Sequence, residues 1–252
     1  MSWVIAIPSF RRSVTLHDKT LRLLNREGLL NRVTVFVVPE EEEEYKVIVP
    51  YVKVVVGVEG MANQRNFMTS YYPVGTKILY MDDDIKGMIE YDDESDRREK
   101  PLVGLKEKVD KWFEILSASG FRLFGIYPVA NGYFMKKGFT MDLRYIIGSF
   151  YGIINPGIDE LEITLDDKED YLRTLLMYIY DGGVVRFTDV SVVTAYYYEK
   201  GGMQVKRTEG RVLASAKSLV RDFPDLCTLN LTKKSGYAEI RLKDRRWTFQ
   251  ES

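Results

Sequence analysis

Apolar and polar positions follow two different periods along the first half of the chain. Four short runs rich in β-branched and other apolar residues predict strands, at residues 3–7, 33–38, 52–56 and 77–81. Apolar residues recur at helical spacing over 16–27, 61–72 and 106–117. Gly28 stands where the first helix is expected to end. Strands that alternate with helices favour an α/β fold, in which helices cover both faces of a mainly parallel sheet.

Two charged segments carry no predicted chemistry. The glutamate run at 40–44 follows Pro39 and predicts a solvated helix start. The stretch at 89–100, in which acidic and basic residues are mixed, predicts an exposed loop.

The second half of the chain has a mixed pattern that is richer in strands from Phe121 onward. No internal repeat or low-complexity linker marks a boundary before about residue 200. We therefore expect one α/β domain over residues 1–200 and a C-terminal extension, 201–252, that packs on the same domain.

The composition is that of a globular protein with a substantial core. The chain has 252 residues, of which 45% are hydrophobic and 29% are charged. No apolar stretch approaches the roughly 20 residues that span a bilayer, and the first ten residues lack the features of a secretory signal. One cysteine, Cys227, excludes an intrachain disulfide, and the only histidine, His17, lies away from the acidic motifs. We expect a cytoplasmic protein without a membrane partner.

Three consecutive aspartates, Asp82 to Asp84, directly follow the predicted strand at 77–81. Adjacent carboxylates raise one another's proton affinity unless a cation or several hydrogen-bond donors neutralise them. A solvated acidic turn is one interpretation. The other is a metal site, because open α/β sheets bind ligands at the carboxyl ends of strands and Mg²⁺ and Mn²⁺ prefer carboxylate oxygens. The position after a strand favours the metal site.

A second acidic group lies at the start of a helix that is expected to reach Tyr180 and includes Glu169 and Asp170. These carboxylates could simply complement the positive end of that helix. Alternatively, one of them could accept a proton from a reacting hydroxyl. The presence of the aspartate triplet in the same chain favours the second interpretation.

Four segments resemble, in this order, the motifs of nucleotide-sugar glycosyltransferases of the GT-A fold. They are IAIPSFRR (5–12), GMANQRN (60–66), MDDDI (81–85) and DDKEDYLRTLLMYIYDGG (166–183). Together with the run DGGVVRF to GGMQ (181–204), the acidic motifs also resemble the TET-associated glycosyltransferases, which include base J and phage enzymes that modify hydroxymethylated pyrimidines in DNA. The resemblance implies a Rossmann-like GT-A domain, a UDP-sugar donor and a bound Mn²⁺ or Mg²⁺ ion.

For the acidic triplet, the resemblance implies that Asp84 binds the metal directly. Asp82 would reach the metal through water or bind the donor ribose, and Asp83 belongs to the same donor-binding motif. In an extended segment, alternate side chains point to opposite faces. We therefore expect Asp83 to be the most structural of the three aspartates.

The loop Pro8-Ser9-Phe10-Arg11 resembles the family's contact with the nucleotide. Phe10 would stack on the base and Arg11 would pair with phosphate. Alternatively, Phe10 packs in the core and Arg11 is an ordinary surface charge.

The motif at 60–66 would bring a helix N-terminus, which itself attracts phosphate, close to the donor. The residues implied in donor binding here are Gly60, Asn63, Arg65 and Asn66. The Arg65-Asn66 pair would hold the nucleotide and the acidic loop together, and Arg65 would offset part of the aspartate charge.

In the fourth motif, Asp170 corresponds to the catalytic base, and Glu169 would bind the acceptor or orient Asp170. An aspartate base suits a single, inverting displacement. The resemblance therefore implies a hexosyltransferase, with glucose as the expected sugar.

The net charge of −1 conceals an asymmetry along the chain. Between Lys200 and Trp247, 12 lysines and arginines face five aspartates and glutamates, so this segment carries +7 and the remainder −8. With Tyr237, Trp247 and Phe249, the segment could bind a phosphodiester backbone and stack on bases. The tyrosines at 196–198 could shape an acceptor pocket. Alternatively, the basic residues belong to a solvated helix over 208–220 and a hairpin packed on the main sheet.

We therefore expect a metal-dependent glycosyltransferase that acts on a hydroxymethylated pyrimidine in DNA. One alternative acceptor is a hydroxyl of a protein, lipid or polysaccharide. A second alternative is a nucleic-acid-binding protein that retains the fold without catalysis.

Overall fold

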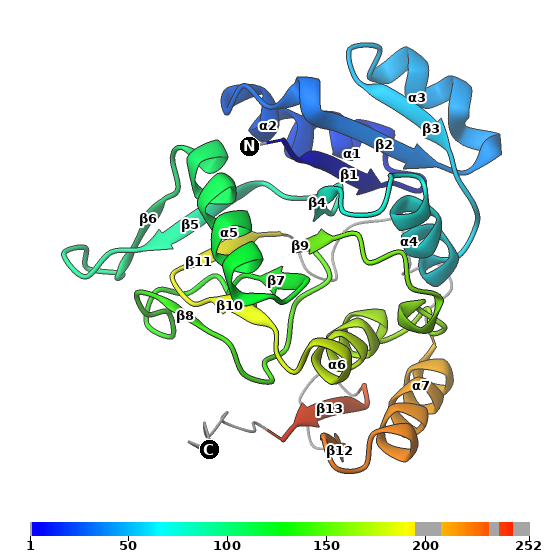
Figure 1. Ribbon diagram of the computed structural model, residues 1–252. Coiled ribbons are helices and arrows are strands. Elements are labelled where there is room, and N and C mark those ends of the chain that lie inside the picture. The colour runs from blue at the N-terminus through cyan, green and yellow to red at the C-terminus, as the bar shows by residue number, and fades with distance from the viewer. Residues whose placement is uncertain (1, 195–207, 232–236, 244–252) are drawn as a thin grey trace.

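The structure is a computed structural model that describes residues 2–194, 208–231 and 237–243 (Figure 1). Several residues that the sequence singled out lie outside these ranges. They are the three tyrosines at 196–198, the glycines of GGMQ, Lys233, Lys234, Arg245, Arg246, Trp247 and Phe249.

An eight-stranded sheet forms the centre of the molecule, in the order β3-β2-β1-β4-β9-β7-β10-β8. Its strands are β1 (Val4–Pro8), β2 (Val33–Val37), β3 (Lys53–Val56), β4 (Lys77–Met81), β7 (Leu123–Gly125), β8 (Phe139–Thr140), β9 (Phe150–Ile154) and β10 (Val185–Phe187). Strands β1 to β4 pair in parallel, whereas β9 runs antiparallel to both β4 and β7. Because of this direction, the residues just before β9 lie at the sheet edge where β1 and β4 end.

Helices cover both faces of the sheet, as the alternation of apolar residues predicts. The helices are a continuous run of α1 (Ser13–Leu16), a π-helical turn (His17–Leu21) and α2 (Arg22–Arg26), then α3 (Glu42–Ile48), α4 (Met61–Ser70), α5 (Leu105–Ser119), α6 (Glu169–Asp181) and α7 (Glu209–Asp222). Ile5 and Ile7 of β1 pack with residues of α1, α2, α3 and α5 on one face, and Ala6 packs with residues of α4 and α6 on the other. This period of two within a buried strand reflects a sheet that is enclosed on both sides.

A smaller sheet corrects the prediction of an exposed loop at 89–100. Strands β5 (Gly87–Tyr91), β6 (Glu99–Pro101) and β11 (Val190–Val193) form an antiparallel sheet in the order β11-β5-β6. The strand β11 that supports β5 lies about 100 residues later in the chain. The charged residues at 89–100 predicted a loop because the strand that pairs with β5 is distant in sequence.

The described part of the C-terminal segment packs on α6 and not on the central sheet, as Figure 1 shows. Strands β12 (Cys227–Asn230) and β13 (Glu239–Leu242) form an antiparallel pair. Their buried residues Cys227 and Ile240 join a cluster with Leu219 of α7 and Leu172 and Leu175 of α6. The helix and the strand pair of the alternative interpretation are present, but the pair packs on α6 and α7 and not on the main sheet.

Among the described residues, no helix has the length and apolar content that crossing a membrane requires.

Candidate active site

The acidic loop begins where β4 ends, and its main chain is fixed on both sides. The Asp82 N–H donates to the Ser149 carbonyl at 2.9 Å, which ties the loop to the entry of β9. The Thr20 hydroxyl donates to the Asp82 carbonyl at 2.7 Å and accepts the Ile85 N–H at 3.0 Å. These contacts place the triplet at the carboxyl edge of the sheet.

Two arginines compensate the charge of the three aspartates. Arg65 Nη2 lies 2.9 Å from Asp82 Oδ1, whereas Arg12 Nη1 lies 3.2 Å from Asp83 Oδ1 and 3.6 Å from Asp84 Oδ2. Residues 83 and 84 form a turn, so the assumption of an extended triplet was wrong. As a result, Asp83 and Asp84 both reach Arg12, while Asp82 alone faces Arg65.

Asp83 is buried beneath the loop that follows β1. Ser9 donates its hydroxyl proton to Asp83 Oδ2 at 2.7 Å, and the Ser9 hydroxyl also lies 2.7 Å from that of Tyr45. Burial raises the pKa of Asp83 to about 7, although Arg12 and Ser9 favour its ionised form. The hydrogen bond between Asp83 and Ser9 therefore joins the acidic loop to the loop after β1.

Phe10 and Arg11 lie beyond this buried layer. Phe10 is partly exposed, and the guanidinium of the exposed Arg11 lies 4.9 Å from the centre of its ring. Arg11 has a φ of 56°, and its N–H donates to both carboxylate oxygens of Glu41. Ser13 donates to Glu44. Two glutamates of the run to which the sequence assigned no chemistry therefore hold the loop after β1 in place.

The start of α4 lies against the acidic segment that precedes α6. Gly60 caps the helix with a φ of 95°, and the next N–H but one, on Ala62, donates to Asp166 Oδ1 at 2.9 Å. Asn63 is exposed and donates to the Glu59 carbonyl at 3.2 Å. Asn66 bonds to both the N–H and the carbonyl of Ile163, at 2.9 and 2.8 Å. The side chain of Asn66 therefore joins α4 to the segment before α6.

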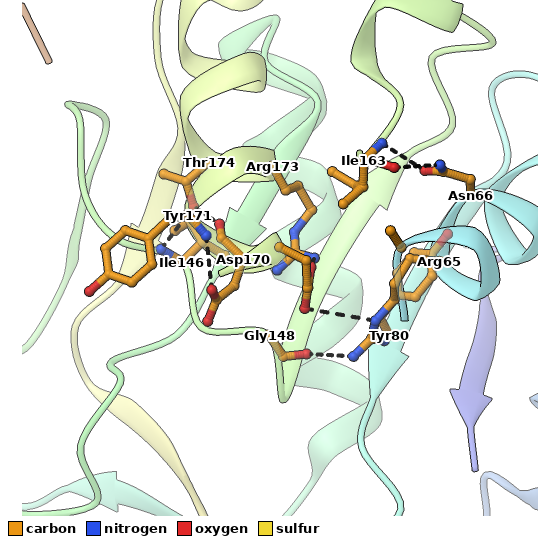
Figure 2. A network of polar contacts seen from close by, with 12 residues as sticks. Arg65, Asn66, Tyr80, Ile146, Gly148, Ile163, Asp170, Tyr171, Arg173 and Thr174 are labelled. Atoms are coloured by element: carbon orange, nitrogen blue, oxygen red, sulfur yellow. Dashed lines mark hydrogen bonds and ion pairs between the residues drawn. The ribbon is translucent and has the colours of Figure 1, made fainter. Parts of the chain in front are cut away.

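A buried network of charges joins the acidic loop to α6. Figure 2 shows its centre, with Arg65 beside the Gly148 carbonyl and Arg173 on α6. Besides Asp82, Arg65 Nη2 contacts the Gly148 carbonyl at 3.1 Å, and Arg65 Nε lies 4.0 Å from Glu169 Oε1. The second Glu169 oxygen accepts from Arg173 Nη1 at 2.5 Å. Burial raises the pKa of Glu169, and the two guanidinium groups oppose this shift. One carboxylate of the second acidic group is therefore held between two arginines.

Asp170 lies on the other side of Glu169 and is held by two donors. The Tyr145 hydroxyl donates to Asp170 Oδ2, and the Tyr171 N–H donates to Oδ1 at 2.9 Å. Burial, together with the neighbouring Asp170 charge, raises the pKa of Tyr145, so this phenol retains the proton that it donates. A Cβ on Gly148 would lie 2.7 Å from Glu169 Oε1 and 3.5 Å from Asp170 Cβ, so a larger residue here would displace the Glu169 carboxylate.

Three residues with central contacts were absent from the predicted site. Arg173 follows Glu169 by four residues, a spacing that pairs opposite charges on a helix and could have revealed it. Arg12 adjoins the predicted Arg11 within the same motif. Tyr145 had no such signal, because it meets Asp170 only through the packing of α6 on the segment before β9.

The aspartates at the carboxyl edge fit a hard divalent cation in their chemistry. The Asp82 side chain is 35% exposed and the Asp84 side chain 15%, and both present carboxylate oxygens. Among the described residues, no group of three or more histidine, cysteine, aspartate or glutamate side chains could enclose a metal. An ion bound by Asp82 and Asp84 would therefore take further ligands from water or from phosphate oxygens, as Mg²⁺ commonly does.

The sequence matches no protein-family model, and no curated protein matches it. Among solved structures, the chain is similar to the fragment 1–349 of S. aureus TarS, with a TM-score of 0.53 and 14% identity over 76% of this chain and 59% of that one. It is also similar to the 4-diphosphocytidyl-2C-methyl-D-erythritol synthase of Anaerococcus prevotii, with a TM-score of 0.41 and 11% identity over 77% of this chain and 94% of that one.

The likeness to TarS, a GT-A-type glycosyltransferase, concerns the fold. It confirms the predicted fold class, a GT-A-like α/β architecture with a mostly parallel central sheet. Neither likeness supports the narrower resemblance to the TET-associated DNA glycosyltransferases, which stays a prediction.

Replacement of Arg12 by methionine is expected to destabilise the fold, because it leaves the Asp83 carboxylate buried without its cation. Removal of one partner of a buried ion pair costs about 3–5 kcal/mol. The matched change at the exposed Arg11 is expected to alter the free energy of unfolding by less than about 0.5 kcal/mol. Urea unfolding at about pH 8 measures both variants.

The destabilisation should also depend on pH. Asp83 has a folded pKa above its usual value of 3.8, so its ionisation lowers stability as the pH rises from 3.8 towards about 7. Loss of Arg12 raises the folded pKa further, and the variant and wild type should therefore differ most above pH 7. Equal destabilisation at about pH 5.5 and about pH 8 would contradict the pairing of Arg12 with a buried Asp83.

Proposed function

We propose that this protein is a glycosyltransferase that transfers a sugar from a UDP-sugar to an acceptor hydroxyl. The observation that supports this most is the link, through Arg65, between the acidic loop after β4 and the Glu169-Asp170 pair at the start of α6. Transfer of a sugar needs both a centre that stabilises a diphosphate and a base, and this sheet edge offers a candidate for each.

The donor diphosphate would lie between the end of β4 and the start of α4. The ten-residue helix α4 begins at Met61, after Gly60, and its first N–H groups favour negative charge. Phe10 and Arg11 extend from the neighbouring loop after β1 and would contact the base and a phosphate. Arg12 and Arg65, which now compensate the aspartates, would add positive charge close to the leaving group.

Asp82 and Asp84 would hold a Mn²⁺ or Mg²⁺ ion together with the diphosphate. Such an ion acts as a Lewis acid that stabilises the charge of a leaving diphosphate. Asp83 remains bonded to Ser9 and Arg12 in this arrangement and positions the turn that carries its two neighbours.

Asp170 would accept the proton of the acceptor hydroxyl. The hydrogen bonds from Tyr145 and from the Tyr171 N–H hold its carboxylate in place. Each carboxylate oxygen has a further lone pair that can take the incoming proton. Attack by the acceptor oxygen on the anomeric carbon, from the side opposite the diphosphate, would release UDP with inversion, and the expected sugar is glucose.

For the acceptor, we propose a hydroxymethylated pyrimidine in DNA. The proposal rests on the resemblance of the motifs and on the +7 charge between Lys200 and Trp247. Five cationic side chains in the described part of that segment are exposed, on Arg211, Lys217, Arg221, Arg241 and Lys243. A phage origin would accord with this acceptor.

The Asp84→Asn variant is expected to lose turnover and to bind the donor more weakly, because it lacks a charged metal ligand. Excess chelator should have the same effect on the wild type, and Mn²⁺ or Mg²⁺ should restore activity. Release of UDP from a UDP-sugar measures both effects. Asp93→Asn, which changes an exposed aspartate on the β5–β6 turn, is the matched control. Full activity in excess chelator would exclude the metal.

The Asp170→Asn variant is expected to bind the UDP-sugar normally while turnover falls by roughly 100-fold or more, as for the loss of a general base. Calorimetric donor binding and the transfer rate separate the two effects. The control is Asp225→Asn, at an exposed aspartate beyond α7. If turnover persists and only thermal stability decreases, Asp170 is a charge that stabilises the start of α6.

The acceptor can be identified by incubation of the protein with a panel of UDP-sugars and three DNAs. The DNAs contain hydroxymethylcytosine, hydroxymethyluracil or unmodified pyrimidines, and nucleoside mass spectrometry detects the product. We expect transfer only to a hydroxymethylated base, and at least as readily in single strands, since a target base must leave its stack. Release of UDP without DNA modification would indicate a different hydroxyl, whereas DNA binding without UDP release would indicate a non-catalytic nucleic-acid-binding protein.

A further inference from the structure

A cavity of about 270 Å³ lies between α4, α6 and the segment that follows β9. Its lining includes Thr69 and Ser70 of α4, Met177 of α6 and the loop residues from 155 to 159. Of the residues placed in the candidate active site above, Arg65, Asn66, Ile163 and Arg173 also line this cavity, but the aspartates of the acidic loop and Asp170 do not. The cavity is therefore a separate space behind the network of charges.

Two buried arginines at this cavity have N–H groups without a hydrogen-bond partner. They are Nε and Nη1 of Arg65, which is 3% exposed, and Nε and Nη2 of Arg173, which is 2% exposed. Figure 2 shows the two side chains extending towards one another from α4 and α6, with Ile163 beside them. A buried donor without an acceptor costs free energy, so four such atoms in one place point to a missing acceptor.

The aromatic contact of Arg173 does not supply that acceptor. Arg173 Cζ lies 3.6 Å from the centre of the Tyr151 ring, a distance that requires the guanidinium to lie nearly flat on the ring. The N–H bonds of a flat guanidinium point outward in its own plane. Its Nη1 reaches Glu169, and the remaining edge points away from the ring face.

Among the described residues, the two guanidinium groups are the positive charges in the lining of the cavity. Glu169 is buried between the two guanidinium groups, and Asp82 contacts only the outer side of Arg65. The cavity rim carries two exposed carboxylates, Asp159 and Glu162, which would repel a polyanion such as a nucleic-acid backbone. A planar or tetrahedral oxyanion matches the forked donors of arginine, and the volume suits a small molecule.

We propose that the cavity between α4 and α6 binds a small oxyanion, a phosphate or carboxylate group, through the free Nε–Nη2 edge of Arg173 and the free Nη1 group of Arg65. The evidence for this site does not rest on the proposed glycosyl transfer, although Arg65 and Arg173 also compensate Glu169 of the candidate active site. A free phosphate and the carboxylate of a small organic acid share this chemistry, and the experiment distinguishes them.

The experiment is an NMR titration of wild-type protein labelled with ¹⁵N-arginine. The Nε–H signals of Arg65, Arg173 and Arg221 are assigned by through-bond correlation on wild-type protein labelled uniformly with ¹³C and ¹⁵N. Inorganic phosphate and acetate are then added separately in saturating UDP, with sodium chloride at matched ionic strength as the blank. We expect a saturable shift of the Arg173 and Arg65 signals, and the anion that saturates at lower concentration identifies the preferred group. Arg221, which is 75% exposed on α7, should not shift.

The same titration on Arg173→Lys tests the site without removing charge. Lysine lacks the planar fork of arginine, so we expect binding to weaken about tenfold or more, as for loss of a hydrogen bond to a charged group. Arg221→Lys should bind as the wild type does. If the lysine variant does not fold, the wild-type titration alone decides. The absence of any saturable Arg173 shift with both anions, or an equal shift of Arg221, would overturn the proposal.

Discussion

The candidate site depends on one buried cation, the guanidinium of Arg65. This group contacts Asp82 after β4, the Gly148 carbonyl before β9 and Glu169 at the start of α6. These three segments are far apart in sequence. A buried charge is tolerated only when its surroundings compensate it, so each segment must hold its partner in place. The position of the acidic loop relative to α6 therefore follows from the hydrogen bonds and ion pairs that compensate a single buried arginine.

A second arginine accounts for the stability of three adjacent aspartates. Arg12 lies against Asp83 and Asp84, and Arg65 takes Asp82, so the repulsion within the triplet is offset from two sides. The central aspartate is buried and bonded, whereas its neighbours retain exposed carboxylate area. The two arginines offset the charge of the triplet, and Asp82 and Asp84 still present exposed carboxylate oxygens.

The sequence predicted the first four strands and the helices between them because their patterns are local. Each strand is a short apolar run, and each helix repeats apolar residues within its own length. The ribbon of β5 and β6 was missed because its support, β11, lies about 100 residues away. The same reason applies in the site. The spacing of Arg173 from Glu169 is a local signal that could have identified it, whereas Tyr145 contacts Asp170 only after the chain has folded.

Helix α6 carries the residues of two sites within one turn. Asp170 accepts a hydrogen bond from Tyr145, whereas Arg173 pairs with Glu169 and lines the cavity. Glu169 is bound by the same guanidinium whose other edge lacks an acceptor. An anion that binds the free edge of Arg173 would interact with the same positive charge that compensates Glu169. Solvent screens this interaction weakly, because both groups are buried. The electrostatics of the cavity and of the catalytic pair are therefore coupled through one side chain, whatever the acceptor of the reaction is.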